Sequence, residues 1–309
     1  MSKRILFFGN EQLATGTAPR LAIISKLLEL DYQITSIVIS QANYQDSKRV
    51  LDTTSMEQFA VRNNIPLIYF DSNQLLKEQI LKLQVDTALL VAYGKIIPTS
   101  ILELFKNGII NVHPSLLPAH RGPTPIESAL RNGDRTTGVS LIKLISKMDA
   151  GPIYSQEAIT ILEGISKQAL VDKLSLLASQ MIETNLAKII NNELIPKDQT
   201  DNQVSYDHLI KKEDSWLNVN QPAELLEREI RAYLNWPKSK VKLSGIDLII
   251  TKAHVLKKDS KEPGKLYLQD QEVGIYTAKD ILVFDRVQPI SKNEMNIKDF
   301  LLGYRSKLI

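Results

Sequence analysis

The chain has 309 residues, of which 43% are hydrophobic and 24% charged, and its formal net charge is +3 at pH 7. This length suffices for two globular domains, and the small net charge means that nucleic-acid binding would need local basic patches. The sequence has no cysteine, which excludes disulfides, thiolate metal sites and cysteine nucleophiles. No signal-peptide pattern and no apolar run of about 18 residues is present, so we expect a cytoplasmic protein without a membrane span.

The first part of the chain alternates short apolar runs with amphipathic segments. Strands are predicted at residues 4–8, 33–40, 66–70, 87–93 and 108–113. Helices are predicted between them, at residues 17–30, 54–64, 73–83 and 98–105. Alternation of this kind is typical of an α/β fold with a doubly wound, mostly parallel sheet.

The pattern changes near residue 126, where a helix is predicted over 126–133. Two strands, at 137–145 and 152–160, are joined by a connection so short that it favours antiparallel pairing. A long helix at about 166–191 is followed by a polar segment rich in residues that break secondary structure. We therefore expect a first domain over 1–192, a linker over 193–205 and a second domain over 206–309.

The second domain is predicted to be a small β-barrel of the OB kind. Its first element is an amphipathic helix at 222–234, and the rest of the segment reads as short strands separated by turns. No pair of histidines has the spacing of metal ligands, and the turn after the first strand lacks the glycines of a dinucleotide site. We therefore expect neither a metal nor a dinucleotide cofactor.

Three polar residues form the strongest candidate for chemistry. Asn111 and His113 lie two residues apart at the end of a predicted strand, so their side chains point to one face at the edge where doubly wound sheets carry their sites. Asp149 lies in the connection "KMDAGP", where it can form an ordinary turn or orient the imidazole and fix its tautomer. Such a set suits attack of an amine on a carbonyl, because the amide stabilises an oxyanion and the imidazole moves protons. Spacing alone is equally compatible with a purely structural hydrogen bond between Asn111 and His113.

Three longer segments carry a family resemblance. They are "VAYGKIIP" (91–98), "GIINVHPSLLPAHRGPTPIE" (108–127) and "TGVSLIKLISKMDAGPIYSQ" (137–156), and together they resemble the methionyl-tRNA formyltransferase family. The similarity extends over nearly the whole chain, and the string NVH-x-SLLP-x-x-RG is specific to folate-dependent formyltransferases. The resemblance implies a Rossmann-like formyltransferase domain, 10-formyltetrahydrofolate as the donor and the α-amine of methionyl initiator tRNA as the acceptor. A monomer is expected.

The resemblance also assigns roles to individual residues. It implies that Asn111, His113 and Asp149 are catalytic. It places the folate donor against these residues: Val91, Tyr93, Gly94, Ser115, Leu116, Leu117 and Pro118. The Leu117–Pro118 peptide is predicted to be cis, because related enzymes turn sharply there to shape the folate site. The candidate tRNA contacts are Lys48, Arg49, Arg121, Arg231, Lys238, Lys240 and Lys242.

Positive charge is concentrated between residues 228 and 265. Ten cations and four acids leave an excess of six there, in a chain whose total is +3. We interpret this segment as a wall that holds tRNA phosphates, and an ordinary solvated barrel surface is the alternative.

Other functions remain open. One is the same chemistry on a nucleotide-linked amino sugar, and another is a non-catalytic RNA-binding protein built on a folate-enzyme scaffold. Glycinamide ribonucleotide enzymes resemble only the first part of the chain, and they lack a second domain.

Overall fold

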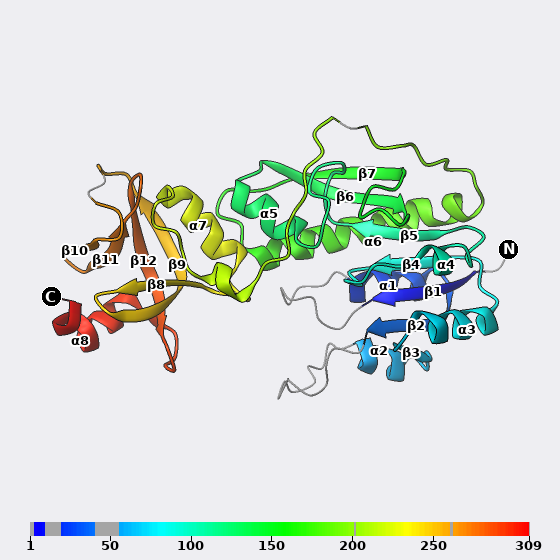
Figure 1. Ribbon diagram of the computed structural model, residues 1–309, viewed down its shortest axis with the longest axis horizontal. Coiled ribbons are helices and arrows are strands. Elements are labelled where there is room, and N and C mark those ends of the chain that lie inside the picture. Colours follow the sequence, from blue (N-terminus) through cyan, green and yellow to red (C-terminus); the bar gives the residue numbers. More distant parts are fainter. Residues whose placement is uncertain (1–2, 10–19, 41–55, 201, 260–261, 309) are drawn as a thin grey trace. The chain divides into compact units, whose positions relative to one another are not determined.

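The computed structural model describes residues 3–9, 20–40, 56–200, 202–259 and 262–308. The chain forms two compact units (Figure 1). The first comprises Met1–Pro125 and Thr136–His208, and the second comprises Ile126–Arg135 and Leu209–Ile309. The segment expected as a linker, 193–205, therefore belongs to the first unit, and residues 126–135 belong to the second unit.

The first unit is built on a seven-stranded sheet with the strand order β3-β2-β1-β4-β5-β6-β7. Its strands are β1 (Arg4–Gly9), β2 (Gln33–Ser40), β3 (Leu67–Phe70), β4 (Ala88–Val91), β5 (Ile109–His113), β6 (Thr136–Lys143) and β7 (Ile153–Thr160). Strands β1 to β5 pair in parallel, whereas β6 pairs antiparallel with both β5 and β7. The predicted doubly wound sheet with a mixed edge is confirmed.

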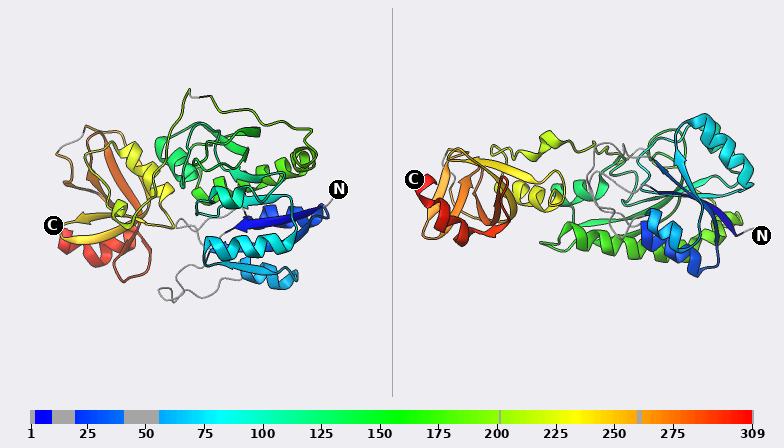
Figure 2. Two further views of the ribbon diagram at one scale, coloured as in Figure 1. Left: turned by 45° about the vertical axis from the view of Figure 1, so that its right-hand side comes forward. Right: turned by 90° about the horizontal axis from the view of Figure 1, so that it is seen from below.

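Helices cover both faces of this sheet. They are α1 (Arg20–Glu29), α2 (Met56–Arg62), α3 (Asn73–Leu83), α4 (Thr99–Leu102) and α6 (Lys167–Ile190). Helix α1 packs against α6 on one face, and α3 lies on the other face, as the right-hand view of Figure 2 shows. The side-chain alternation of β1 explains this arrangement, since Leu6 and Phe8 point to the same side and pack with Leu76 and Ile80 of α3.

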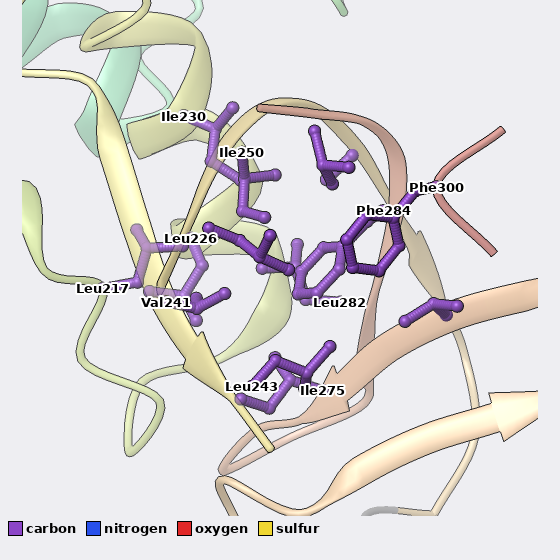
Figure 3. Packing of buried hydrophobic residues seen from close by; sticks show 14 of the residues in the cluster. Leu217, Leu226, Ile230, Val241, Leu243, Ile250, Ile275, Leu282, Phe284 and Phe300 are labelled. Atoms are coloured by element: carbon purple, nitrogen blue, oxygen red, sulfur yellow. The ribbon is translucent and has the colours of Figure 1, made fainter. Parts of the chain in front are cut away.

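The second unit contains an antiparallel sheet with the order β10-β11-β12-β9-β8, and β13 pairs with β12. Its strands are β8 (Ser239–Leu243), β9 (Ile246–Leu256), β10 (Leu266–Gln269), β11 (Glu272–Tyr276), β12 (Ile281–Pro289) and β13 (Met295–Asn296). The sheet curls around a buried core that includes Leu226, Ile250, Leu282 and Phe284 (Figure 3). This half-barrel agrees with the expected OB-like domain.

Three helices and a short 3-10 turn complete the second unit. Helix α5 (Pro125–Asn132) contacts α7 (Ala223–Ala232) through a 2.8 Å ion pair between Arg131 of α5 and Glu229 of α7. The 3-10 turn η1 (Lys212–Ser215) precedes α7. Helix α8 (Ile297–Leu308) was not predicted from the sequence, and its Phe300 is completely buried in the core. Within the described ranges, no helix has the length and apolarity needed to cross a membrane.

Candidate active site

Strand β5 positions the two polar residues that the sequence singled out. Asn111 lies between Leu90 of β4 and Ile142 of β6, and His113 lies opposite Ser140. Both side chains therefore emerge at the carboxyl end of a central strand, on the same face. They are more enclosed than expected, since Asn111 is 5% exposed and His113 is 4% exposed.

The imidazole of His113 is held by the loop that follows β5. Its Nε2 lies 2.9 Å from the backbone carbonyl oxygen of His120. A carbonyl oxygen only accepts hydrogen bonds, so Nε2 carries a proton and the neutral ring keeps its lone pair on Nδ1. The nearest oxygen of Asp149 lies 3.6 Å from Nδ1, beyond ordinary hydrogen-bond distance. The expectation that the carboxylate fixes the tautomer is therefore wrong, since the backbone carbonyl does so.

Asp149 is held at both of its carboxylate oxygens. Oδ1 accepts a hydrogen bond from Nδ2 of Asn111 at 3.2 Å, and Oδ2 accepts one from the backbone N–H of Gly122 at 2.9 Å. These bonds hold the carboxylate beside Nδ1 of His113. Nδ2 of Asn111 has a second N–H, which can donate to an oxygen that gains negative charge.

The loop between β5 and α5 is tied to the neighbouring strands. The hydroxyl of Ser140 donates to the carbonyl of Ser115 at 2.6 Å and accepts from the N–H of Leu117 at 3.1 Å. The side-chain amide of Gln156 donates to the carbonyl of Leu117 at 2.8 Å. The Leu117–Pro118 peptide is cis, which confirms the prediction. Together these bonds hold the loop that carries the carbonyl of His120.

Two backbone segments expected at the folate site leave the sheet side by side. Val91 ends β4 and His113 ends β5, and these strands are neighbours, so the turns at 91–94 and 114–118 start at adjacent carboxyl ends. Gly94 has φ of +72°, in the left-handed region that favours glycine.

Several of the expected folate residues have buried side chains. Val91 and Tyr93 are each 1% exposed, and the ring of Tyr93 packs edge-on against Phe8. Burial raises the pKa of the Tyr93 hydroxyl. Ser115 is completely buried, and its hydroxyl donates to the carbonyl of Ala119 at 2.8 Å. Contacts with a folate at these positions would therefore fall mainly to the backbone.

Of the tRNA contacts expected in the first unit, the structure describes only Arg121. Lys48 and Arg49 lie outside the described residues. Arg121 is only 4% exposed, and its guanidinium donates to the side chains of Gln199 and Tyr206. This burial does not support the expected tRNA contact of Arg121, because its guanidinium already holds partners inside the unit.

The cations expected on the second unit are closer to its surface. Lys238 and Lys240 are half-buried, and the Lys240 ammonium lies 6.0 Å from the ring centre of Trp216, whose side chain is 48% exposed. Lys242 lies 3.7 Å from Asp247, and Arg231 forms a 2.6 Å ion pair with a carboxylate of the same helix. Internal pairing thus neutralises part of the excess charge that the sequence places in this segment.

Sequence reasoning missed two residues near these groups. Gln199 lies in a polar segment read as a spacer, yet its side chain contacts Arg121 and the turn of Asp149. Trp216 follows a short 3-10 turn and gave no periodic signal. Among the described residues, no group of histidine, aspartate or glutamate could hold a metal ion.

The chain was compared with known proteins. Residues 3–186 match the family described as formyl transferase, and residues 209–305 match the formyl transferase C-terminal domain. A methionyl-tRNA formyltransferase of Levilactobacillus brevis is 31% identical over 304 residues, covering 97% of this chain and 95% of the relative.

Solved structures share the fold at lower identity. An N-formyltransferase from Helicobacter canadensis, in complex with folinic acid and dTDP-3-aminofucose, has a TM-score of 0.68 at 17% identity, covering 94% of this chain and all of that one. HypX from Aquifex aeolicus in complex with tetrahydrofolic acid has a TM-score of 0.64 at 15% identity, covering 97% of this chain and 47% of that one. The sequence matches over both domains decide the family: the chain belongs to the formyl transferases and, within them, to the methionyl-tRNA formyltransferases.

Proposed function

We propose that Asn111, His113 and Asp149 transfer the formyl group of 10-formyltetrahydrofolate to the α-amine of methionyl initiator tRNA. The observation that carries the proposal is the arrangement of these three groups at the end of β5, in a chain that resembles methionyl-tRNA formyltransferases along its full length. The folate compounds bound to structural relatives support a tetrahydrofolate-type donor.

Each residue has a defined task in this reaction. The donor supplies a formyl group attached to nitrogen. As the amine nitrogen bonds to the formyl carbon, the carbonyl oxygen gains negative charge, which the free N–H of Asn111 stabilises. Nδ1 of His113 accepts the proton that the amine loses and returns it to the folate nitrogen as the carbon–nitrogen bond of the donor breaks. Asp149 stabilises the imidazolium between these two events.

The second unit supplies a surface suited to the acceptor. Lys240 and Lys242 lie on β8, and the ammonium group of Lys240 lies over the exposed ring of Trp216, so a phosphate and an unstacked base would bind next to each other on this surface. We infer that this surface binds tRNA while the methionyl end reaches Asn111 and His113. In this proposal the protein acts as a monomer in the cytoplasm.

The acceptor decides between this function and the amino-sugar alternative. The purified protein is incubated with 10-formyltetrahydrofolate and, in separate reactions, with charged initiator tRNA, charged elongator tRNA and a dTDP-linked amino sugar. The proposal requires formylmethionine on initiator tRNA at the highest kcat/KM. Formylation of the sugar in preference to both tRNAs would contradict the proposed function and favour an amino-sugar formyltransferase, such as the Helicobacter canadensis enzyme whose fold is similar.

A further inference from the structure

Residues 197–200 and 202–208 of the first unit, here together called the strap, are bonded to the loops that carry the candidate catalytic groups. At one end, Lys197 and Ile153 exchange two backbone hydrogen bonds, of 2.7 and 2.9 Å. At the other end, the N–H of Arg121 donates to Ser205 at 2.9 Å, and the N–H of Asp207 donates to Arg121 at 2.7 Å. Backbone hydrogen bonds therefore tie one end of the strap to the start of β7 and the other end to the loop that follows β5.

The strap approaches the catalytic loop very closely. Gly122 has φ of +126°, and a Cβ atom added to it would lie 2.4 Å from the carbonyl oxygen of Asp207. The N–H of this same glycine donates to the carboxylate of Asp149. The backbone that holds Asp149 is thus pressed directly against the strap.

One side chain of the strap joins the two loops of the site. Nε2 of Gln199 donates to the carbonyls of Asp149 at 2.7 Å and Gly151 at 2.8 Å. Its Oε1 accepts from Nε of Arg121 at 3.0 Å and from Nη2 at 2.7 Å. All the polar atoms of this amide are therefore used to connect the Asp149 turn with the loop that follows β5.

The Asp149 turn needs such support. Asp149 has φ of +45°, in the left-handed region that residues other than glycine rarely adopt. A Cβ atom added to Gly151 would lie 1.8 Å from the carbonyl oxygen of Lys143, so the turn is also closely packed. A strained backbone persists only where its surroundings fix it, and here Gln199 holds the carbonyls on either side of Ala150.

We propose that Gln199 is a positioning residue for Asp149, and that the strap is thereby part of the catalytic unit. Its amide and the buried guanidinium of Arg121 fix the backbone from which the carboxylate reaches Nδ1 of His113. This inference rests on the proposed function of Asn111, His113 and Asp149. It assigns Arg121 an internal role in place of a tRNA contact.

The test is a double-mutant cycle on formyl transfer to charged initiator tRNA. Gln199→Met keeps the side-chain length and removes both donor and acceptor. A loss of positioning should lower kcat about 10- to 100-fold, since a displacement of about 1 Å can cost about 10²-fold. The KM for tRNA should stay within about twofold. In an Asp149→Asn background, the same substitution should have almost no further effect, because the group that it positions is already impaired.

Two further variants complete the design. Gln199→Glu keeps the acceptor for Arg121 but replaces the two donors with a carboxylate facing carbonyls, so its kcat should also fall, by about tenfold or more. Gln168→Met is the matched control, because Gln168 is an exposed residue of α6 that bonds only locally, to Asp172. Its kcat should equal that of the wild type.

The outcomes separate the two proposals. Wild-type kcat in Gln199→Met or Gln199→Glu overturns the positioning role, and so does an equal loss from Gln199→Met in both backgrounds, which indicates a general structural effect. Wild-type kcat in Asp149→Asn alone instead overturns the proposed catalytic site.

Discussion

Replacing Asp149 with asparagine removes one charge while keeping the shape of the side chain. The carboxylate lies 3.6 Å from Nδ1 of His113, and the two side chains are 13% and 5% exposed. At that separation, with an effective dielectric constant of about 20, the attraction between the carboxylate and an imidazolium is about 4 to 5 kcal/mol. Since about 1.4 kcal/mol corresponds to a factor of ten in rate, the upper bound on the loss lies between about 10³- and 10⁴-fold.

The geometry adds a second penalty in Asp149→Asn. Both carboxylate oxygens accept from N–H donors, one on Asn111 and one on Gly122. An asparagine has only one oxygen, so its NH2 group must face one of these donors. We therefore expect kcat for formyl transfer to fall about 10²- to 10³-fold, while the KM for tRNA changes by less than about threefold.

Steady-state assays with charged initiator tRNA measure this change. Asp172→Asn is the control, because Asp172 is an exposed carboxylate on α6 that accepts a hydrogen bond from Gln168 within the same helix. A kcat for Asp149→Asn within about threefold of the wild type would refute the argument that this carboxylate stabilises the His113 imidazolium.

Three further predictions follow from the same structure. His113→Ala should lower kcat by about 10²- to 10⁴-fold and Asn111→Ala by about 10²- to 10³-fold, with donor binding retained, and a turnover near that of the wild type in either variant would remove that residue from the site. Burial raises the pKa of the Glu229 carboxyl, although its ion pair with Arg131 acts in the opposite direction. The folded state therefore gains free energy of unfolding from the protonated carboxyl at pH values below the ordinary pKa of a glutamate. This stability is lost as pH rises through the raised pKa. Glu229→Gln should therefore gain stability relative to the wild type in urea unfolding as pH rises from about 4 to about 8, and a pH-independent difference would contradict this. Reversing the charges of Lys240 and Lys242 should raise the KM for tRNA about tenfold or more and leave that for the donor unchanged, whereas an unchanged KM for tRNA would exclude this surface.

The sequence predicted the first unit well because its elements have strong local signals. The segments that became β1 and β2 are short runs rich in apolar residues, and α3 has a serine at its N-cap, Ser72, whose hydroxyl accepts from the third N–H of the helix. Asn111 and His113 share a face because strands alternate with a period of two, so their proximity was predictable from spacing. The short connection after a predicted strand suggested Asp149 as a partner of the imidazole, and the family resemblance was needed to assign it a catalytic role.

The remaining features depend on contacts between residues distant in sequence. The carbonyl that fixes the His113 tautomer belongs to His120, and a backbone group gives no sequence signal. Gln199 bonds to Asp149, 50 positions away, from a segment whose composition is that of a spacer. Helix α8 was missed because its sequence is short and mixed in polarity, and its stability comes from packing Phe300 and Leu301 into the core.

The most direct test of the proposed function is a single-turnover reaction, with enzyme in excess over charged initiator tRNA and with 10-formyltetrahydrofolate that carries an isotope label in the formyl group. This measurement isolates the chemical step from product release. In the wild type, the label should appear on the amine of methionine, and Asn111→Ala should slow its appearance about 10²- to 10³-fold with tRNA affinity unchanged. Absence of the label from methionine in the wild type, or equal rates in the two proteins, would contradict the assignment of Asn111 and its neighbours as the site of formyl transfer.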